Sequence, residues 1–112
     1  HAEVYRSAFA ISVCPADNVE SPTIVGAQAA NELLNIVGIK ASFVLTEYQG
    51  KIYVSSRSID EINVQLIMER LGGGGHLTMA GAQIKNSTTN DVRKALIRVL
   101  DSKLAQASKF EN

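Results

Sequence analysis

The sequence predicts an α/β fold, with three main helices packed on a mixed β-sheet of about four to five strands. Segments rich in β-branched and aromatic residues alternate with segments whose apolar residues recur every three or four positions. The predicted order is strand, helix, strand, strand, helix, strand, helix, which is typical of helices covering a sheet. The length of 112 residues and the hydrophobic content of 46% suit one domain with a single core.

The first strand and helix are predicted from residues 4–14 and 23–37. The strand segment is apolar on both faces, so we expect it well inside the sheet. Ser21 suits the N-cap, Pro22 the first helical position and Gly38 the helix stop. The apolar residues of the helix repeat at spacings of three and four and predict its buried face: Ala27, Ala30, Leu33, Leu34 and Val37.

A hairpin and a second helix follow. Residues 39–48 and 51–58 read as strands, and the intervening Gln49 and Gly50 favour a tight turn. Ser58 is the predicted N-cap of the next helix, with Glu61 completing a capping box. The predicted buried residues of this helix, which ends at the glycines, are Ile59, Ile62, Leu66, Ile67 and Leu71.

The last elements are a short strand over residues 81–85 and a helix capped by the segment that starts at Thr88. The predicted buried face of that helix comprises Val92, Ala95, Leu96, Val99, Leu100 and Leu104. Its basic residues lie mainly off this face, so they form either a solvated surface or a docking surface for another domain.

Charge and composition exclude several classes of protein. The 11 basic and 11 acidic side chains cancel, so the chain lacks the broad basic field that holds long nucleic acids. The single cysteine, Cys14, excludes an internal disulfide and is expected to be buried and inert. Apolar segments are too short to span a membrane. We interpret residues 1–112 as one domain of a longer protein, with residues 1–3 either a cloning remnant or part of that protein.

The most unusual segment is the run of glycines at residues 72–75, followed directly by His76. Each glycine loses much backbone entropy on folding, so the run must serve backbone conformation or close approach of a ligand. A ligand loop with peptide N–H groups facing phosphate is one interpretation, and a flexible linker is the other. Leu71 and Leu77 flank the run, which favours the ligand loop.

Arg57 is the candidate phosphate contact on the other side of the predicted helix. Its guanidinium offers a planar set of donors, and Ser55, Ser56 and Ser58 add hydroxyl groups. The alternatives are a surface ion pair between Arg57 and a nearby carboxylate, Asp60 or Glu61, and a purely structural role for His76. If the helix packs antiparallel to its strand, Arg57 and the glycines lie about 18 Å apart, and a shared pocket requires an extended ligand, a loop that folds back or a bent strand.

Familiar catalytic motifs are missing. The glycines are not followed by Lys-Ser/Thr and do not form the spaced dinucleotide-binding fingerprint. One internal histidine and scattered carboxylates do not suggest a metal site. We therefore expect no catalytic residue, no metal ligand and no cofactor in this chain, which alone should be inactive.

The segment SSRSIDEINVQLIMERLGGGGH, the later GAQI and the helix sequence AANELL together resemble the DHH-associated domain of the DHH phosphoesterase superfamily. More narrowly, they resemble the C-terminal domains of the membrane-anchored cyclic-di-AMP phosphodiesterases of Gram-positive bacteria. The similarity covers almost the whole chain. The arginine upstream of a GGGH motif is its most specific part.

The resemblance implies a role as the substrate-binding half of a divided active site. A DHH domain of the same polypeptide would bind manganese and hydrolyse the phosphodiester of cyclic di-AMP, a signalling nucleotide, to the linear dinucleotide. The implied ligand contacts are Ser56, Arg57, Ser58, Gly73, Gly74, Gly75 and His76. The parent protein would be anchored in the cell membrane, with this domain on the cytoplasmic side and making no membrane contact. A homodimer is compatible with the resemblance.

Two other functions remain open on the sequence. The same motif occurs in oligoribonucleases and 3′,5′-bisphosphate phosphatases, where it reads a short RNA end. A non-catalytic RNA-binding or dimerising module, as at the end of alanyl-tRNA synthetases, is the third possibility. The near-zero net charge argues against this third function, since tRNA binding usually requires a basic stripe.

Overall fold

A mixed sheet of six strands dominates the computed structural model, which describes residues 2–14, 21–59 and 62–102. The strand order is β1-β2-β3-β4-β6-β5, with β2 parallel to β3 and the other neighbours antiparallel. The strands are β1 (Ala2–Tyr5), β2 (Phe9–Cys14), β3 (Ala41–Tyr48), β4 (Lys51–Ser58), β5 (Gly74–Gly75) and β6 (Met79–Lys85). The helices are α1 (Pro22–Leu33), α2 (Val64–Arg70) and α3 (Thr89–Leu100).

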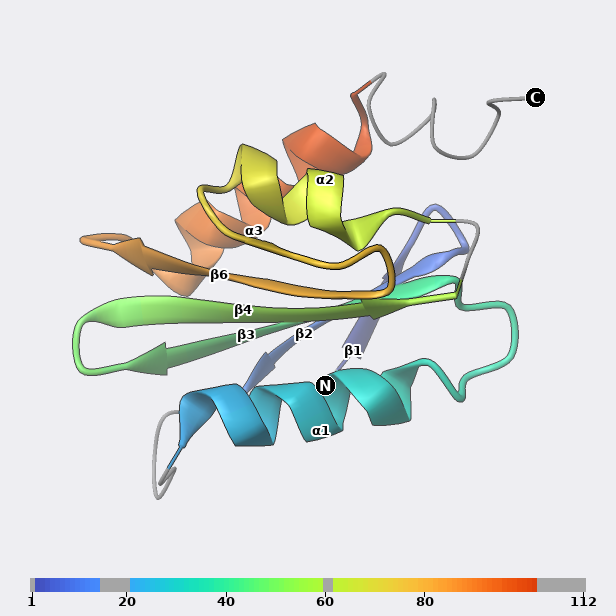
Figure 1. Ribbon diagram of the computed structural model, residues 1–112, viewed down its shortest axis with the longest axis horizontal. Helices are drawn as coiled ribbons and strands as arrows, with labels where there is room; N and C mark the ends of the chain where they lie inside the picture. The colour runs from blue at the N-terminus through green and yellow to red at the C-terminus, as the bar shows by residue number, and fades with distance from the viewer. Residues whose placement is uncertain (1, 15–20, 60–61, 103–112) are drawn as a thin grey trace.

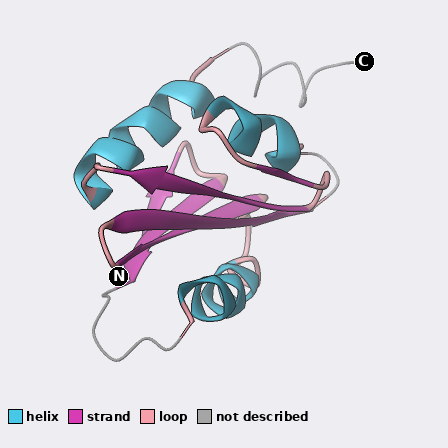
Figure 2. Cartoon of the chain, turned by 60° about the vertical axis from the view of Figure 1, so that its left-hand side comes forward, coloured by secondary structure: helices cyan, strands magenta, loops and turns pink. Residues whose placement is uncertain are grey.

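The helices cover the two faces of the sheet unequally. Helix α1 lies alone on one face, whereas α2 and α3 lie together on the other (Figure 1, Figure 2). Helix α1 packs against β3 and β4, and α2 packs against β6 and β5. The predicted α/β class and three helices are confirmed by this three-layer arrangement.

The apolar core lies between the sheet and the pair α2 and α3. Its side chains come from alternate positions of the strands and from the inner faces of the helices, and they include Phe43, Leu45, Ile52, Ile67, Met68 and Leu96. The predicted inner face of the last helix is confirmed for Val92, Leu96, Val99 and Leu100, while Leu104 is outside the described residues.

The contact between α1 and the sheet is built from small residues. Gly26 and Ala30 are buried, and Ser42, Thr46 and Ser55 lie buried on the sheet below the helix. A Cβ on Gly26 would come within 2.5 Å of Ser55 Oγ, so glycine is needed for this close approach. The predicted apolar face was therefore wrong in part, because α1 ends at Leu33 and Val37 is 98% exposed.

The sheet has six strands, whereas the sequence predicted about four to five. Residues 4–14 do not form one strand, because Arg6 and Ser7 adopt positive φ values of 52° and 61° and turn β1 back along β2. The two-residue strand β5 is also additional. A turn without glycine, asparagine or proline carries little sequence signal, so this hairpin was missed.

The hairpin between β3 and β4 confirms the prediction. Gln49 and Gly50 both have positive φ, at 51° and 79°, as a tight turn matched to strand twist requires. Ser21 and Thr88 are also confirmed as N-caps, since their hydroxyls accept bonds from the amides of Ile24 and Asp91.

The predicted cap of the second helix was wrong. Ser58 is the last residue of β4, and its hydroxyl donates to the carbonyl of Ile62 at 2.6 Å. Asn63 is the N-cap instead, accepting from the amide of Leu66 at 3.2 Å. Glu61, the predicted capping partner, lies outside the described residues.

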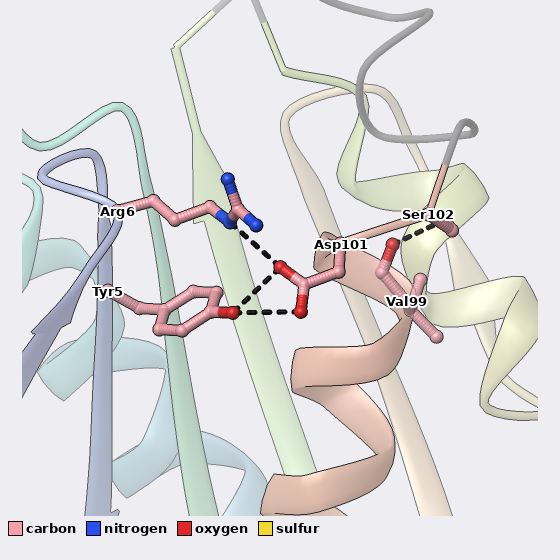
Figure 3. Close-up of polar contacts among 5 residues, drawn as sticks. All are labelled: Tyr5, Arg6, Val99, Asp101 and Ser102. Atoms are coloured by element: carbon pink, nitrogen blue, oxygen red, sulfur yellow. Dashed lines mark hydrogen bonds and ion pairs between the residues drawn. The ribbon is translucent and has the colours of Figure 1, made fainter.

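Polar contacts fasten β1 to α3. Tyr5 Oη donates to both carboxylate oxygens of Asp101 at 2.7 and 2.9 Å, and Arg6 Nε donates to Asp101 Oδ1 at 2.8 Å (Figure 3). Glu3 receives two bonds from Arg93, at 2.7 and 2.5 Å. Glu3 therefore belongs to the folded domain, and these contacts hold the outer strand to the last helix.

Candidate functional site: a groove between helix α1 and the glycine loop

An open groove of about 470 Å³ lies on the α1 face of the sheet. Helix α1 covers β3 and β4 but leaves β6 and β5 open on that face, so the groove runs beside the helix. Its walls are made by Thr23, Ala27, Tyr53, Val54, Ser55, Arg57, Gly72, Gly73, Gly74, Gly81, Ala82 and Gln83. Residues of the helix, two strands and the loop thus face one space.

Strand alternation explains which side chains reach the groove. Tyr53, Ser55 and Arg57 occupy alternate positions of β4 and therefore share a face. Across β6, Gln83 lies opposite Tyr53 and Gly81 lies opposite Ser55. The absence of a side chain at Gly81 leaves the middle of the groove open.

Arg57 is the charged group of the groove. Its Nη1 donates to the carbonyl of Ser56 at 2.8 Å, while its buried Nε has no hydrogen-bond partner in the described structure. Burial lowers the pKa of the Arg57 guanidinium from its usual value. Within the described ranges no carboxylate forms an ion pair with it, and the predicted alternative partners, Asp60 and Glu61, are outside those ranges. A donor of this kind suits an anion in the groove.

The glycine loop begins as the C-cap of α2, as predicted. Gly72 has a φ of 90°. The amide of Gly72 donates to the carbonyl of Glu69, and the amide of Gly73 donates to the carbonyl of Met68. These two hydrogen bonds together form a Schellman motif. The amide of His76 donates to the carbonyl of Met79 at 2.6 Å. These peptide groups already have internal acceptors, so the loop does not present an open row of N–H groups.

The loop then folds back along the sheet, which removes the expected separation from Arg57. Gly74 pairs with Gly81 of β6, and Gly81 pairs with Ser55 of β4. Of the arrangements that would unite loop and arginine, the fold-back is the one adopted, and the short α2 ends at Arg70. Arg57 and residues 72–74 consequently line one groove.

The glycines of the loop serve different purposes. A Cβ on Gly73 would clash with the Gly81 carbonyl, and one on Gly75 would come within 2.5 Å of Ala80 Cα and the Met79 carbonyl. Gly72 needs its positive φ. Gly74 alone in this run has neither a positive φ nor an atom within 4 Å of a Cβ placed on it. Neither a positive φ nor a close contact therefore explains the glycine at position 74.

The remaining predicted site residues lie elsewhere. Ser56 is fully buried on the opposite face of β4 and donates to the carbonyl of Ala80 at 2.7 Å. Ser58 also faces away, bonded to the carbonyls of Ile62 and Leu77. Gly75 ends β5 and His76 lies in the turn before β6; both are exposed, and neither lines the groove. The structure therefore unites Arg57, Gly73 and Gly74, and separates them from Ser56, Ser58, Gly75 and His76.

Several groove residues were missed in the sequence. Tyr53 follows from alternation back from Arg57, a signal that was available. Gln83 and Gly81 require the register between β4 and β6, and Thr23 requires the position of α1 on the sheet. These last three depend on tertiary packing that no local pattern specifies.

The described residues contain no group of three or more histidine, cysteine, aspartate or glutamate side chains placed to hold a metal ion. They do not fit the manganese centre that the resemblance implies for a DHH domain. Among the same residues no helix is long and apolar enough to cross a membrane.

The fold and the groove define a small α/β domain in which one arginine lies in a groove beside a glycine loop. The sequence profile of the DHHA1 domain matches residues 9–106. The chain therefore belongs to the DHHA1 domain family, as its motifs predicted.

Comparison with characterised proteins gives the same assignment. The chain is 44% identical over 101 residues to the cyclic-di-AMP phosphodiesterase PdeA of Listeria monocytogenes, covering 89% of this chain and 15% of that protein. It is 35% identical over 103 residues to the cyclic-di-AMP phosphodiesterase GdpP of Bacillus subtilis, covering 90% of this chain and 16% of the relative. The chain thus spans only a small part of these multidomain relatives.

Solved structures share the fold. An exopolyphosphatase-related protein from Bacteroides fragilis superposes with a TM-score of 0.81 at 22% identity, over 96% of this chain and 33% of that one. The C-Ala domain of Aquifex aeolicus alanyl-tRNA synthetase superposes with a TM-score of 0.69 at 18% identity, over 91% of this chain and 99% of that one. At these identities the likeness concerns the fold alone.

Proposed function

We propose that this chain is the substrate-binding domain of a manganese-dependent cyclic-di-AMP phosphodiesterase, whose DHH catalytic domain belongs to the same polypeptide. The observation that carries the proposal is Arg57, a half-buried guanidinium in the groove with an unpartnered Nε. Buried donors are normally satisfied, so an unsatisfied one at a site calls for an explanation. A phosphodiester oxygen would supply the missing acceptor and offset the loss of water around the charge.

The other groove residues suit the rest of a nucleotide. Ser55, Thr23 and Gln83 offer hydroxyl and amide groups for ribose or base, and Tyr53 offers an aromatic ring. The open position of Gly74 permits the ligand to approach the main chain. A small number of polar groups placed around one cation, Arg57, can fix the orientation of a ligand.

In this proposal the domain positions the phosphodiester and neutralises its charge. The relatives named as cyclic-di-AMP phosphodiesterases are six or more times longer than the matched region, which leaves room for a DHH domain and a membrane anchor. Metal bound in the DHH domain supplies the hydroxide when present. Arg57 holds the phosphate and strengthens its contact as negative charge develops in the transition state. A cytoplasmic location and a homodimer belong to the same proposal.

The rival functions predict different ligands. An oligoribonuclease domain would bind a short RNA end, and an RNA-binding module would bind tRNA through a basic surface. Arg57 is the one cationic side chain among the residues that wall the groove. One cation in the groove suits a single phosphate group better than the long backbone of a tRNA.

The test is a titration of the chain with cyclic di-AMP, its linear product pApA and a tRNA, followed by backbone amide shifts in NMR. We expect cyclic di-AMP to shift the amides of Ser55, Gly74 and Gly81. Binding of tRNA with no response to either dinucleotide would overturn the proposal.

A further inference from the structure

The face of the sheet that lines the groove continues past the groove toward the turn between β3 and β4. Beyond Tyr53 and Gln83, the next residues on the same face are Lys51 of β4 and Lys85 of β6, which lie directly opposite each other. Lys51 is half-buried and Lys85 exposed, and neither takes part in an ion pair within the described residues. Lys51 and Lys85 thus form a pair of cations on this face of β4 and β6, at the end remote from Arg57.

Like charges directly opposite in a sheet destabilise it. A lysine at an open edge strand discourages unwanted pairing, which accounts for Lys85, since β5 pairs only with Ala80 and Gly81 of β6. Edge protection does not account for Lys51, because β4 is an interior strand between β3 and β6. Glu47, a neighbouring carboxylate, is opposite Ile52 and therefore lies on the core face, away from these lysines.

Other features of this end also favour an anion. Helix α1 begins here, since Thr23 lines the groove near Tyr53, and its first turn contains no acidic residue. The N-terminal end of a helix carries a partial positive charge. Tyr53 is held edge-to-face against Tyr48, with ring centroids 6.4 Å apart, so a fixed aromatic surface lies between the two cationic ends.

We propose that Lys51 and Lys85 form a second anion-binding subsite, which takes a further phosphate of a linear nucleotide chain whose first phosphate is held by Arg57. Lys51 and Arg57 are six positions apart along β4, which corresponds to roughly 20 Å between their Cα atoms. With both side chains standing roughly perpendicular to the sheet, a compact cyclic dinucleotide at Arg57 leaves the lysines free, whereas a linear chain of four nucleotides reaches them. The inference rests on the proposed function, because it assumes a nucleotide phosphate at Arg57.

The experiment compares cyclic di-AMP with the 5′-phosphorylated linear tetraadenylate by NMR titration of the chain. Wild type should show amide shifts at Lys51 and Lys85 with the tetraadenylate only. Lys85→Glu should weaken tetraadenylate binding about fivefold and reduce its salt slope by roughly 0.7, while cyclic di-AMP is unaffected. The same variant should raise Tm, because it replaces a cation pair by an opposite-charge pair.

Lys94→Glu is the matched control, since Lys94 is exposed on α3 across the sheet and the substitution changes the net charge equally. Equal weakening by Lys94→Glu, equal weakening for both ligands, or unchanged tetraadenylate binding in Lys85→Glu would overturn the subsite. Arg57→Gln tests the underlying assumption separately. If it changes the binding of neither ligand, the proposed function itself is wrong and the subsite falls with it.

Discussion

A desolvated arginine without an anionic partner costs the fold stability, and Arg57 is such a residue. Its burial lowers the pKa of the guanidinium, and its Nε lacks an acceptor among the described residues. A buried arginine that stabilises the fold would instead be paired with a carboxylate. This pattern supports our proposal that Arg57 binds a ligand, and it argues against a role in folding stability.

Replacing Arg57 by Met should separate these two roles. We expect the free energy of unfolding of Arg57→Met to equal or exceed that of wild type, because an apolar side chain of similar length removes the desolvation cost. Urea denaturation measures it. Arg98→Met, at an exposed helix position, serves as the control. A marked loss of stability in Arg57→Met alone would show that the arginine is structural.

The glycines provide a second residue-level prediction. Gly73→Ala should destabilise the domain by about 1–3 kcal/mol or more, since its Cβ meets backbone atoms of β6. Gly74→Ala should leave unfolding within about 0.5 kcal/mol of wild type and yet weaken nucleotide binding. Thermal denaturation and ligand titration of both variants measure this contrast. Full nucleotide binding by a stable Gly74→Ala would remove Gly74 from the site.

At the level of elements, β1 and α3 depend on ion pairs at both ends of the strand. The hydrogen bonds from Tyr5 and Arg6 lower the pKa of Asp101, and Arg93 lowers the pKa of Glu3. A carboxyl whose folded pKa is depressed stabilises the fold above its unfolded pKa and loses that contribution as the pH falls through the folded value. This attachment should therefore weaken in acid.

Asp101→Asn should lower Tm at pH 7. The difference from wild type should begin to shrink as the pH falls below about 4, the ordinary aspartate range, and should vanish only below the depressed pKa of Asp101 in the folded state. Thermal melts at a series of pH values measure this. Glu47→Gln is the control variant, because it removes an exposed carboxylate that has no ion pair in the described part of the chain. A constant offset between Asp101→Asn and wild type at all pH values would contradict the assignment.

Elements with local signals were predictable from the sequence, and elements that depend on distant contacts were not. The turn at Gln49 and Gly50 and the caps at Ser21 and Thr88 follow from neighbouring residues alone. The β1–β2 turn at Arg6 and Ser7 lacks turn residues, and the cap shifted from Ser58 to Asn63 because β4 continues to Ser58 to pair with β3.

The site shows the same division. Arg57 and the glycine run were visible as residue types, and Tyr53 was accessible by alternation. The fold-back of the loop onto β6, which unites Arg57 with Gly74, comes from the antiparallel pairing of β5 with β6. Ser56 and Ser58 looked like ligand contacts because they neighbour Arg57, but adjacent strand residues point to opposite faces.

At the scale of the whole molecule, the chain corresponds to a small part of its longer relatives. It covers 15% of PdeA and 16% of GdpP, and its described residues offer no metal site. Binding and chemistry are therefore divided in our proposal, with the groove holding the phosphate and the DHH domain breaking the bond. His76, exposed in the turn before β6, is outside the groove but accessible to such a second domain.

The most direct measurement is turnover of cyclic di-AMP by the longer protein carrying Arg57→Met or the control Arg98→Met, with bound metal assayed in both. Loss of one charged hydrogen bond to a desolvated phosphate corresponds to about 1.5–3 kcal/mol, or roughly a ten- to hundredfold lower kcat/KM. We predict this loss for Arg57→Met with unchanged metal content, and wild-type kcat/KM for Arg98→Met. Wild-type turnover by Arg57→Met would contradict the assignment of the groove as the substrate site.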